Sequence, residues 1–154
     1  LNGLYRGEGA LHTQDFDWQG FEWIDCHDAE SSVLIYQRRA LPGDDDTGDS
    51  QRTGDSAADH LVIALNFTPV PREGYRIGMP AAGAYQEVFN SDADDYGGSG
   101  LRNGESPIPA EPIEWMGQPQ SLVVTLPPLA GIVLRPAPAD DPPVASNSTS
   151  DAAG

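Results

Sequence analysis

NFTPVPREGYRIGMP, residues 66–80, decides how this chain folds. It follows LVIAL (61–65), the most apolar run in the sequence, and holds three prolines and two glycines. Proline has no N–H to give to a sheet ladder, so Pro69 and Pro71 should end the strand that LVIAL begins. The polar REG (72–74) would form a turn, after which a second strand starts. The stretch therefore predicts two short strands joined by a proline-rich connection.

Similar short runs, rich in β-branched and aromatic residues, recur between turn residues along the chain. Fourteen prolines and seventeen glycines punctuate the 154 residues. About seven short strands separated by turns indicate an all-β, antiparallel β-sandwich over 16–136. A first segment, FDWQGFEWID (16–25), has β character but is broken by a glycine. The other predicted strands are 31–40, 60–68 (buried on both faces), 75–79, 85–90, 121–126 and 130–136.

Three segments of the sequence lack this strand pattern. Residues 1–13 predict a short helix, in which Leu1, Leu4, Tyr5 and Leu11 form one apolar stripe. Such a helix is marginal alone and needs a partner, so the chain looks cut from a longer protein.

Residues 41–60 are acidic and glycine-rich and predict a long loop, and 91–115 is mostly loop. The tail, 137–154, consists largely of Ala, Asp, Pro and Ser and is expected to be disordered.

The net charge of the chain limits the classes of partner that it is expected to bind. It carries 24 acidic residues against 8 basic ones, all arginine, for a formal net charge of −16. Nucleic acid and anionic membranes both need cationic contacts, so we expect neither as a partner. The acidity suits a neutral partner such as a sugar polymer. It is equally compatible with a salt-adapted or GC-rich source, in which acidity serves solubility.

No catalytic set emerges from the sequence. Three histidines are scattered, and the aspartates at 44–46 and 92–95 lack the spacing and closing glutamate of a calcium loop. We therefore expect no catalytic residue, no metal and no cofactor. The single cysteine, Cys26, is expected to be a buried, inert thiol.

An aromatic cluster is the one candidate binding feature. Trp18, Phe21 and Trp23 fall within a few residues of Gly20. A glycine allows a sharp backbone turn, and an exposed indole offers the flat apolar surface on which a sugar ring stacks. The alternative is that these rings pack between the N-terminal helix and the sandwich.

Several motifs in register resemble one known family. GFEWIDC (20–26), NFTPVPR with GYRIG (66–78), YGGS (96–99) and SLVVTLPPLA (121–130) match the C-terminal region of bacterial glycogen branching enzymes, members of the α-amylase superfamily. The resemblance covers about residues 1–135. The chain departs from the pattern at Gly9, at His27 and in a longer acidic insert, none of which is a catalytic position.

The resemblance implies a division of the chain. Residues 1–15 would be the last helix of a (β/α)8 catalytic barrel, 16–136 an α-amylase-type C-terminal sandwich, and 137–154 a disordered tail. The parent enzyme would break an α-1,4 link and transfer the glucan to a 6-hydroxyl by retaining two-carboxylate chemistry. Its catalytic residues would all lie upstream of Leu1.

The resemblance also implies partners: the barrel and an α-glucan, contacted through Trp23 with Trp18 and Phe21 behind it. A cytoplasmic monomer is expected. The alternative is a stand-alone carbohydrate-binding or structural β-sandwich module without catalysis.

Overall fold

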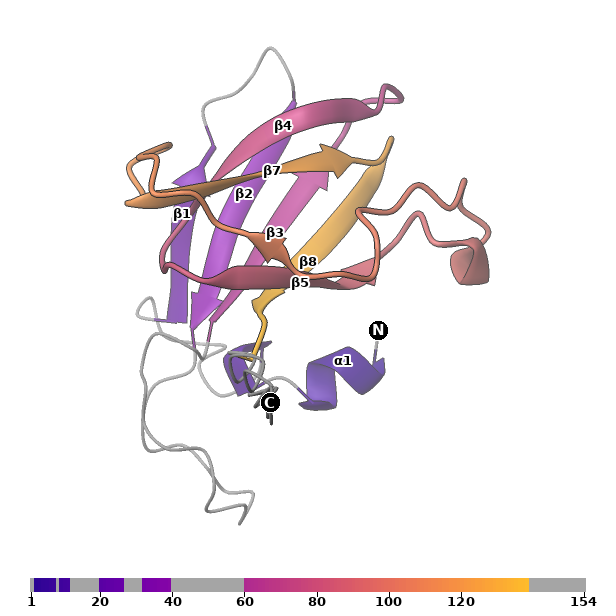
Figure 1. Cartoon of the computed structure of the whole chain (residues 1–154). Helices are drawn as coiled ribbons and strands as arrows, with labels where there is room; N and C mark the ends of the chain where they lie inside the picture. Colours follow the sequence, from indigo (N-terminus) through magenta and orange to yellow (C-terminus); the bar gives the residue numbers. More distant parts are fainter. Residues whose placement is uncertain (1, 8, 12–19, 27–31, 40–59, 139–154) are drawn as a thin grey trace, which may run out of the picture.

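The computed structural model describes residues 2–7, 9–11, 20–26, 32–39 and 60–138. They form two antiparallel sheets with short helical segments (Figure 1), which confirms the predicted all-β class. The elements are α1 (Asn2–Gly7), η1 (Gly9–Leu11), β1 (Phe21–Asp25), β2 (Val33–Arg39), β3 (His60–Asn66), β4 (Arg72–Met79), β5 (Ala84–Asn90), η3 (Asp94–Tyr96), β6 (Ile108–Pro109), β7 (Gln120–Leu126) and β8 (Ala130–Pro136).

The two sheets stack face to face. The larger has the strand order β1-β2-β3-β8-β5-β6, and the smaller pairs β4 with β7. Figure 1 shows β4 and β7 lying across the strands of the larger sheet. Alternate residues of each strand point into the space between the sheets, as the period of two requires. The main core consists of Ile24, Val33, Ile35, Val62, Ala64, Ile77, Met79, Tyr85, Leu122, Val124, Leu126, Ile132 and Leu134.

Strand β3 lies in the interior of the larger sheet, between β2 and β8, and is covered on both faces. Val62 and Ala64 face the main core. Leu61 and Ile63 point to the other side and belong to a second apolar cluster. This explains why LVIAL is a continuous apolar run instead of an alternating one, and it confirms the predicted burial on both faces.

The second cluster is where the N-terminal segment packs. Ala10 of η1 is buried there, and Leu4 and Leu11 pack against it, alongside Leu61 and Val133 of the sheet. The apolar stripe that was expected to lack a partner within this chain is therefore partly covered by the sheet itself. In Figure 1, α1 lies at the bottom of the view, away from β4.

One sequence-based boundary was wrong. The REG stretch is not a turn, because β4 already starts at Arg72 and passes through an irregularity in its pairing between Arg72 and Tyr75. Gly74 lies within this irregularity and has a φ of 63°, a conformation that residues other than glycine rarely adopt. Residues 91–115 are mostly loop, as predicted, and contain the short edge strand β6, which pairs with the start of β5.

Cys26 is exposed, not buried, because it lies just past the end of β1. Three other predictions lie outside the described residues: the placement of Trp18, the acidic loop up to residue 59, and the tail beyond residue 138.

Candidate functional site

Phe21 and Trp23, two members of the predicted aromatic cluster, lie on the outer face of the larger sheet. Phe21 and Trp23 are alternate residues of β1, and Trp23 pairs in register with Tyr36 of β2. The Phe21 and Trp23 rings meet edge to face at 4.9 Å between centroids. Tyr36 lies 5.1 Å from Phe21 and 5.9 Å from Trp23. The two contacts of Trp23 are edge to face and the Phe21–Tyr36 contact is tilted. Ring contacts at such distances are favourable, so the three side chains support one another.

Trp23 keeps half of its surface in solvent. Its exposed fraction is 49%, whereas Tyr36 packs against the second apolar cluster. Burial raises the pKa of Tyr36, and the nearby Arg38 opposes that rise. The Arg38 Nε donates a 3.3 Å hydrogen bond to the carbonyl oxygen of Ala10, so the cluster borders the η1 segment. Trp23 is thus partly packed, as one alternative expects, and partly open to a ligand, as the other expects.

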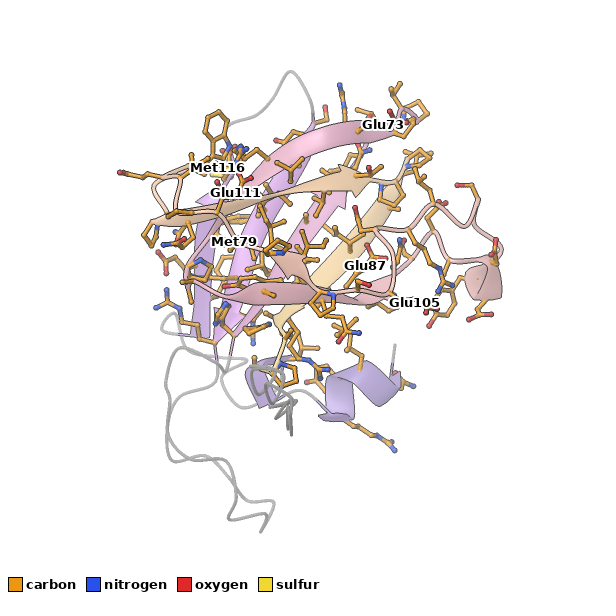
Figure 2. All side chains as sticks on the ribbon, viewed as in Figure 1. Glu73, Met79, Glu87, Glu105, Glu111 and Met116 are labelled. Atoms are coloured by element: carbon orange, nitrogen blue, oxygen red, sulfur yellow. The ribbon has the colours of Figure 1, made fainter. Side chains whose placement is uncertain are left out.

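A second feature was not anticipated: an open groove of about 890 Å³ along β4. Figure 2 shows Glu73 near the start of this strand and Met116 towards its other end. The groove is lined by Asp25, Pro71, Arg72, Glu73, Gly74, Tyr75, Arg76, Trp115 and Met116.

A tight hairpin holds Trp115 at this groove. Trp115 and Gln118 exchange two backbone hydrogen bonds, of 3.0 and 2.9 Å. Met116 and Gly117 between them have φ of 52° and 71°, which is the geometry of a two-residue type I′ turn. Methionine rarely adopts positive φ, so the surrounding contacts must impose this conformation.

The hairpin lies directly on β4 because Gly78 has no side chain. A Cβ on Gly78 would collide with the backbone oxygen of Trp115. The close approach fixes the position of the Trp115 backbone, while 45% of the residue's surface remains exposed.

Arg76 is anchored beside the same hairpin. Its Nη1 donates hydrogen bonds to Glu111 Oε2 at 2.6 Å and to Ser121 Oγ at 2.8 Å. Glu111 is itself fixed, because its backbone exchanges two hydrogen bonds with Ser121 of β7. The guanidinium group therefore has a defined position at the groove.

Asp92, one of the aspartates that superficially resembled a calcium loop, serves the fold. The Asp92 carboxylate accepts hydrogen bonds from the Ser99 hydroxyl (2.5 Å), the Ser99 N–H (3.0 Å) and the Leu101 N–H (3.3 Å). The bonds from Ser99, and more weakly that from Leu101, lower the pKa of Asp92. Within the described residues, no three His, Cys, Asp or Glu side chains gather as a metal site would need.

Comparison with known proteins identifies the fold family. Residues 23–137 match the family described as alpha amylase, C-terminal all-beta domain. The chain belongs to this family of alpha amylase C-terminal all-beta domains. The match starts at Trp23 in β1 and runs just past the end of β8, so it covers the whole sandwich.

Three similar proteins that contain this all-beta domain share the same name. The chain is 55% identical over 136 residues to a 1,4-alpha-glucan branching enzyme of Methylococcus capsulatus, with 88% of this chain aligned. It is 54% identical over 138 residues to the enzyme of that name from Thiobacillus denitrificans, and 48% identical over 138 residues to the one from Rubrobacter xylanophilus. The resemblance drawn from the sequence motifs is confirmed.

The aligned region is a small part of those proteins. It spans 16% of the Methylococcus capsulatus relative and 17% of the other two.

Among the helices of the described residues, none is long and apolar enough to cross a membrane.

The sequence pointed to the aromatic cluster of this all-beta domain but not to the groove. Phe21 and Trp23 come together as expected, and Tyr36 was the member that the sequence reading missed. The groove was missed because Trp115 was assigned to a loop and Arg72 to a turn. The WMGQ stretch (115–118) held a usable signal, since a glycine in the second central position favours a two-residue hairpin.

Proposed function

We propose that this chain is the C-terminal domain of a 1,4-alpha-glucan branching enzyme, whose catalytic barrel transfers α-1,4-glucan segments to 6-hydroxyls in glycogen biosynthesis. The observation that carries the proposal is the identity of about half the residues, over most of this chain, with relatives of that name. Residues 1–15 would then be the end of the barrel, 16–136 the sandwich and 137–154 a tail. Its partners would be the barrel and an α-glucan, in a cytoplasmic monomer without nucleic-acid or membrane contacts.

The domain's own work is to support the barrel and to contact glucan through Trp23, with Phe21 and Trp18 behind it. The half-exposed indole of Trp23 supports this role, because Phe21 and Tyr36 hold the ring in place while its remaining surface stays accessible. A ring held in this way loses little conformational freedom when a sugar stacks on it.

A chimeric enzyme tests the proposed function. This chain would replace the aligned C-terminal segment of the Methylococcus capsulatus relative, and branching would be followed by the loss of iodine colour of amylose and the gain of α-1,6 links. We expect the chimera to branch amylose at a rate within about tenfold of the parent, because the packing surface is retained. The relative without its C-terminal segment, and this chain alone, are the controls and should form no branches.

A folded chimera that forms no branches would refute the assignment to the branching enzyme. New branch points made by this chain alone would refute the proposal that it has only a supporting role. A stand-alone carbohydrate-binding or structural module has no observation in its favour.

A further inference from the structure

The groove along β4 is open and large enough to hold a ligand. Its volume of about 890 Å³ lies within the range of about 300–1,000 Å³ that small-molecule sites occupy. It is lined by Arg72–Arg76 of β4, by Trp115 and Met116 of the hairpin, and by Asp25 at the end of β1. Trp23 lies on the outer face of the larger sheet, beside Tyr36, and is not among the lining residues. The groove therefore differs from the Trp23 surface in the residues that form it.

The aromatic part of the groove is preorganised. Trp115 is held by the two-residue hairpin and by its backbone contact over Gly78, yet its indole remains half exposed. The positive φ of Met116 is backbone strain that the fold sustains at this hairpin. A fixed, flat, accessible ring is the surface on which the apolar face of a sugar ring stacks.

The polar part of the groove has balanced charge. Its lining provides two guanidinium groups as donors and two carboxylates as acceptors, namely those of Arg72, Arg76, Asp25 and Glu73. Arg76 is further neutralised by its 2.6 Å ion pair with Glu111. An anionic ligand would find no excess of cations here, on a chain whose net charge is −16. Neutral hydroxyl groups, which both donate and accept hydrogen bonds, match this lining better.

We propose that the groove along β4 binds a neutral oligosaccharide, which stacks a sugar ring on Trp115 and hydrogen-bonds to the arginine and carboxylate groups beside it. The sugar class follows from the groove itself. Its identification as an α-1,4-glucan rests on the proposed function. Together with the contact proposed for Trp23, the groove would give the domain a second sugar-binding surface.

The chain's three tryptophans allow a direct test by NMR. In the ¹⁵N-labelled chain, the indole N–H signals are assigned through Trp18→Phe, Trp23→Phe and Trp115→Phe. Maltoheptaose, cellohexaose and xylohexaose are then added separately up to millimolar concentration. We expect at least one of them to shift the Trp115 signal in a saturable way, and expect the shift to persist in Trp23→Phe.

Variants separate stacking from structure. Trp115→Ala should weaken binding to the groove, followed through the backbone signals of Arg76 and Gly74, by about tenfold, as expected for loss of one aromatic stack. Trp115→Phe should recover part of that loss because a flat ring remains. Both variants should melt within a few degrees of the unmodified chain, since Trp115 is half exposed.

The outcomes decide between the proposals. A response to maltoheptaose supports both the groove and the glucan assignment. A response to cellohexaose or xylohexaose alone supports a sugar site but removes the link to α-glucan. If Trp115 and its neighbours ignore all three sugars, the groove is not a sugar site, whatever the branching activity of the chimera.

Discussion

The side-chain amide of Asn66 donates a 2.9 Å hydrogen bond to the carbonyl oxygen of Pro127, a residue 61 positions later in the chain. The same nitrogen donates to the carbonyl oxygen of Val70 at 2.9 Å. The Asn66 Oδ1 accepts from the Thr68 N–H at 3.0 Å and from its hydroxyl at 2.7 Å. One buried side chain, 2% exposed, thus joins the proline-rich connection after β3 to the turn between β7 and β8.

Replacing Asn66 should destabilise the whole sandwich. Asn66→Ala leaves the Pro127 carbonyl oxygen without this donor and removes the acceptor for Thr68, so we expect a loss of about 2–4 kcal/mol. Asn66→Asp keeps the acceptor but sets a negative charge against two carbonyl oxygens, and should be at least as costly. Urea unfolding measures both, with the exposed Asn2→Ala as the control. Equal stabilities of Asn66→Ala and Asn2→Ala would contradict the prediction.

Trp23→Ala should weaken glucan binding more than it weakens the fold. A fully buried tryptophan costs about 3–5 kcal/mol when truncated. Because Trp23 is half exposed, we expect about 1–2 kcal/mol and a melting temperature only a few degrees lower. Retardation of the chain in a native gel containing glycogen should fall clearly.

Phe67→Ala provides the control, since Phe67 is an exposed aromatic residue just after β3 that neither belongs to the aromatic cluster nor lines the groove. If Trp23→Ala melts much earlier while its folded fraction is retarded normally, Trp23 is a packing residue and not a glucan contact.

Gly78→Ala should displace the Trp115 hairpin. The new Cβ would collide with the backbone oxygen of Trp115, which cannot rotate away as a side chain could. We expect a loss of about 1–3 kcal/mol and a changed indole N–H signal for Trp115. Gly3→Ala is the matched control, because a Cβ on Gly3 meets nothing within 4 Å and alanine favours the helix. An unchanged Trp115 signal in Gly78→Ala would show that the contact does not hold the hairpin.

Asp92→Asn should lower stability at neutral pH but not in acid. The donors from Ser99 and Leu101 lower the pKa of Asp92 in the folded state. Its contribution to stability is therefore complete above the unfolded pKa of about 4, and is lost as the pH falls through the lower folded value. The melting temperatures of the variant and the unmodified chain should differ at pH 7 and converge well below pH 4.

Asp95→Asn removes a negative charge from the same loop without touching these hydrogen bonds, and serves as the control. Ser99→Ala should act in the same direction as Asp92→Asn. A difference between Asp92→Asn and the unmodified chain that grows in acid would contradict the assignment.

The sequence predicted those parts of the fold that depend on local pattern. The apolar run of β3 and the prolines after it indicated the end of that strand, because proline cannot continue a ladder. Strands β2, β5, β7 and β8 were found within a residue or two for the same kind of reason. The sequence did not reveal which strand pairs with which: β3 lies beside β8 through contacts between distant residues.

The candidate sites also differ in how far the sequence could predict them. Phe21 and Trp23 are near neighbours in sequence, so their cluster was visible, whereas Tyr36 joins it only through the pairing of β1 with β2. The groove needs Asp25, Arg72 and Trp115 together, and these lie far apart in sequence. The REG stretch was predicted to be a turn because it is polar and contains a glycine. The irregular start of an edge strand can have these same features.

The interior position of β3 has a consequence for the newly made protein. During synthesis β1, β2 and β3 emerge before β8, and they can pair as a meander with the outer edge of β3 unsatisfied. Its partner β8 leaves the ribosome later, on the order of ten seconds after β3 at about 5–20 residues per second. Throughout that interval the most apolar strand of the chain presents an open edge, where a neighbouring nascent chain could add a strand. The domain should therefore depend on dilution or on chaperones while it is being made, even though the finished sandwich covers that strand completely.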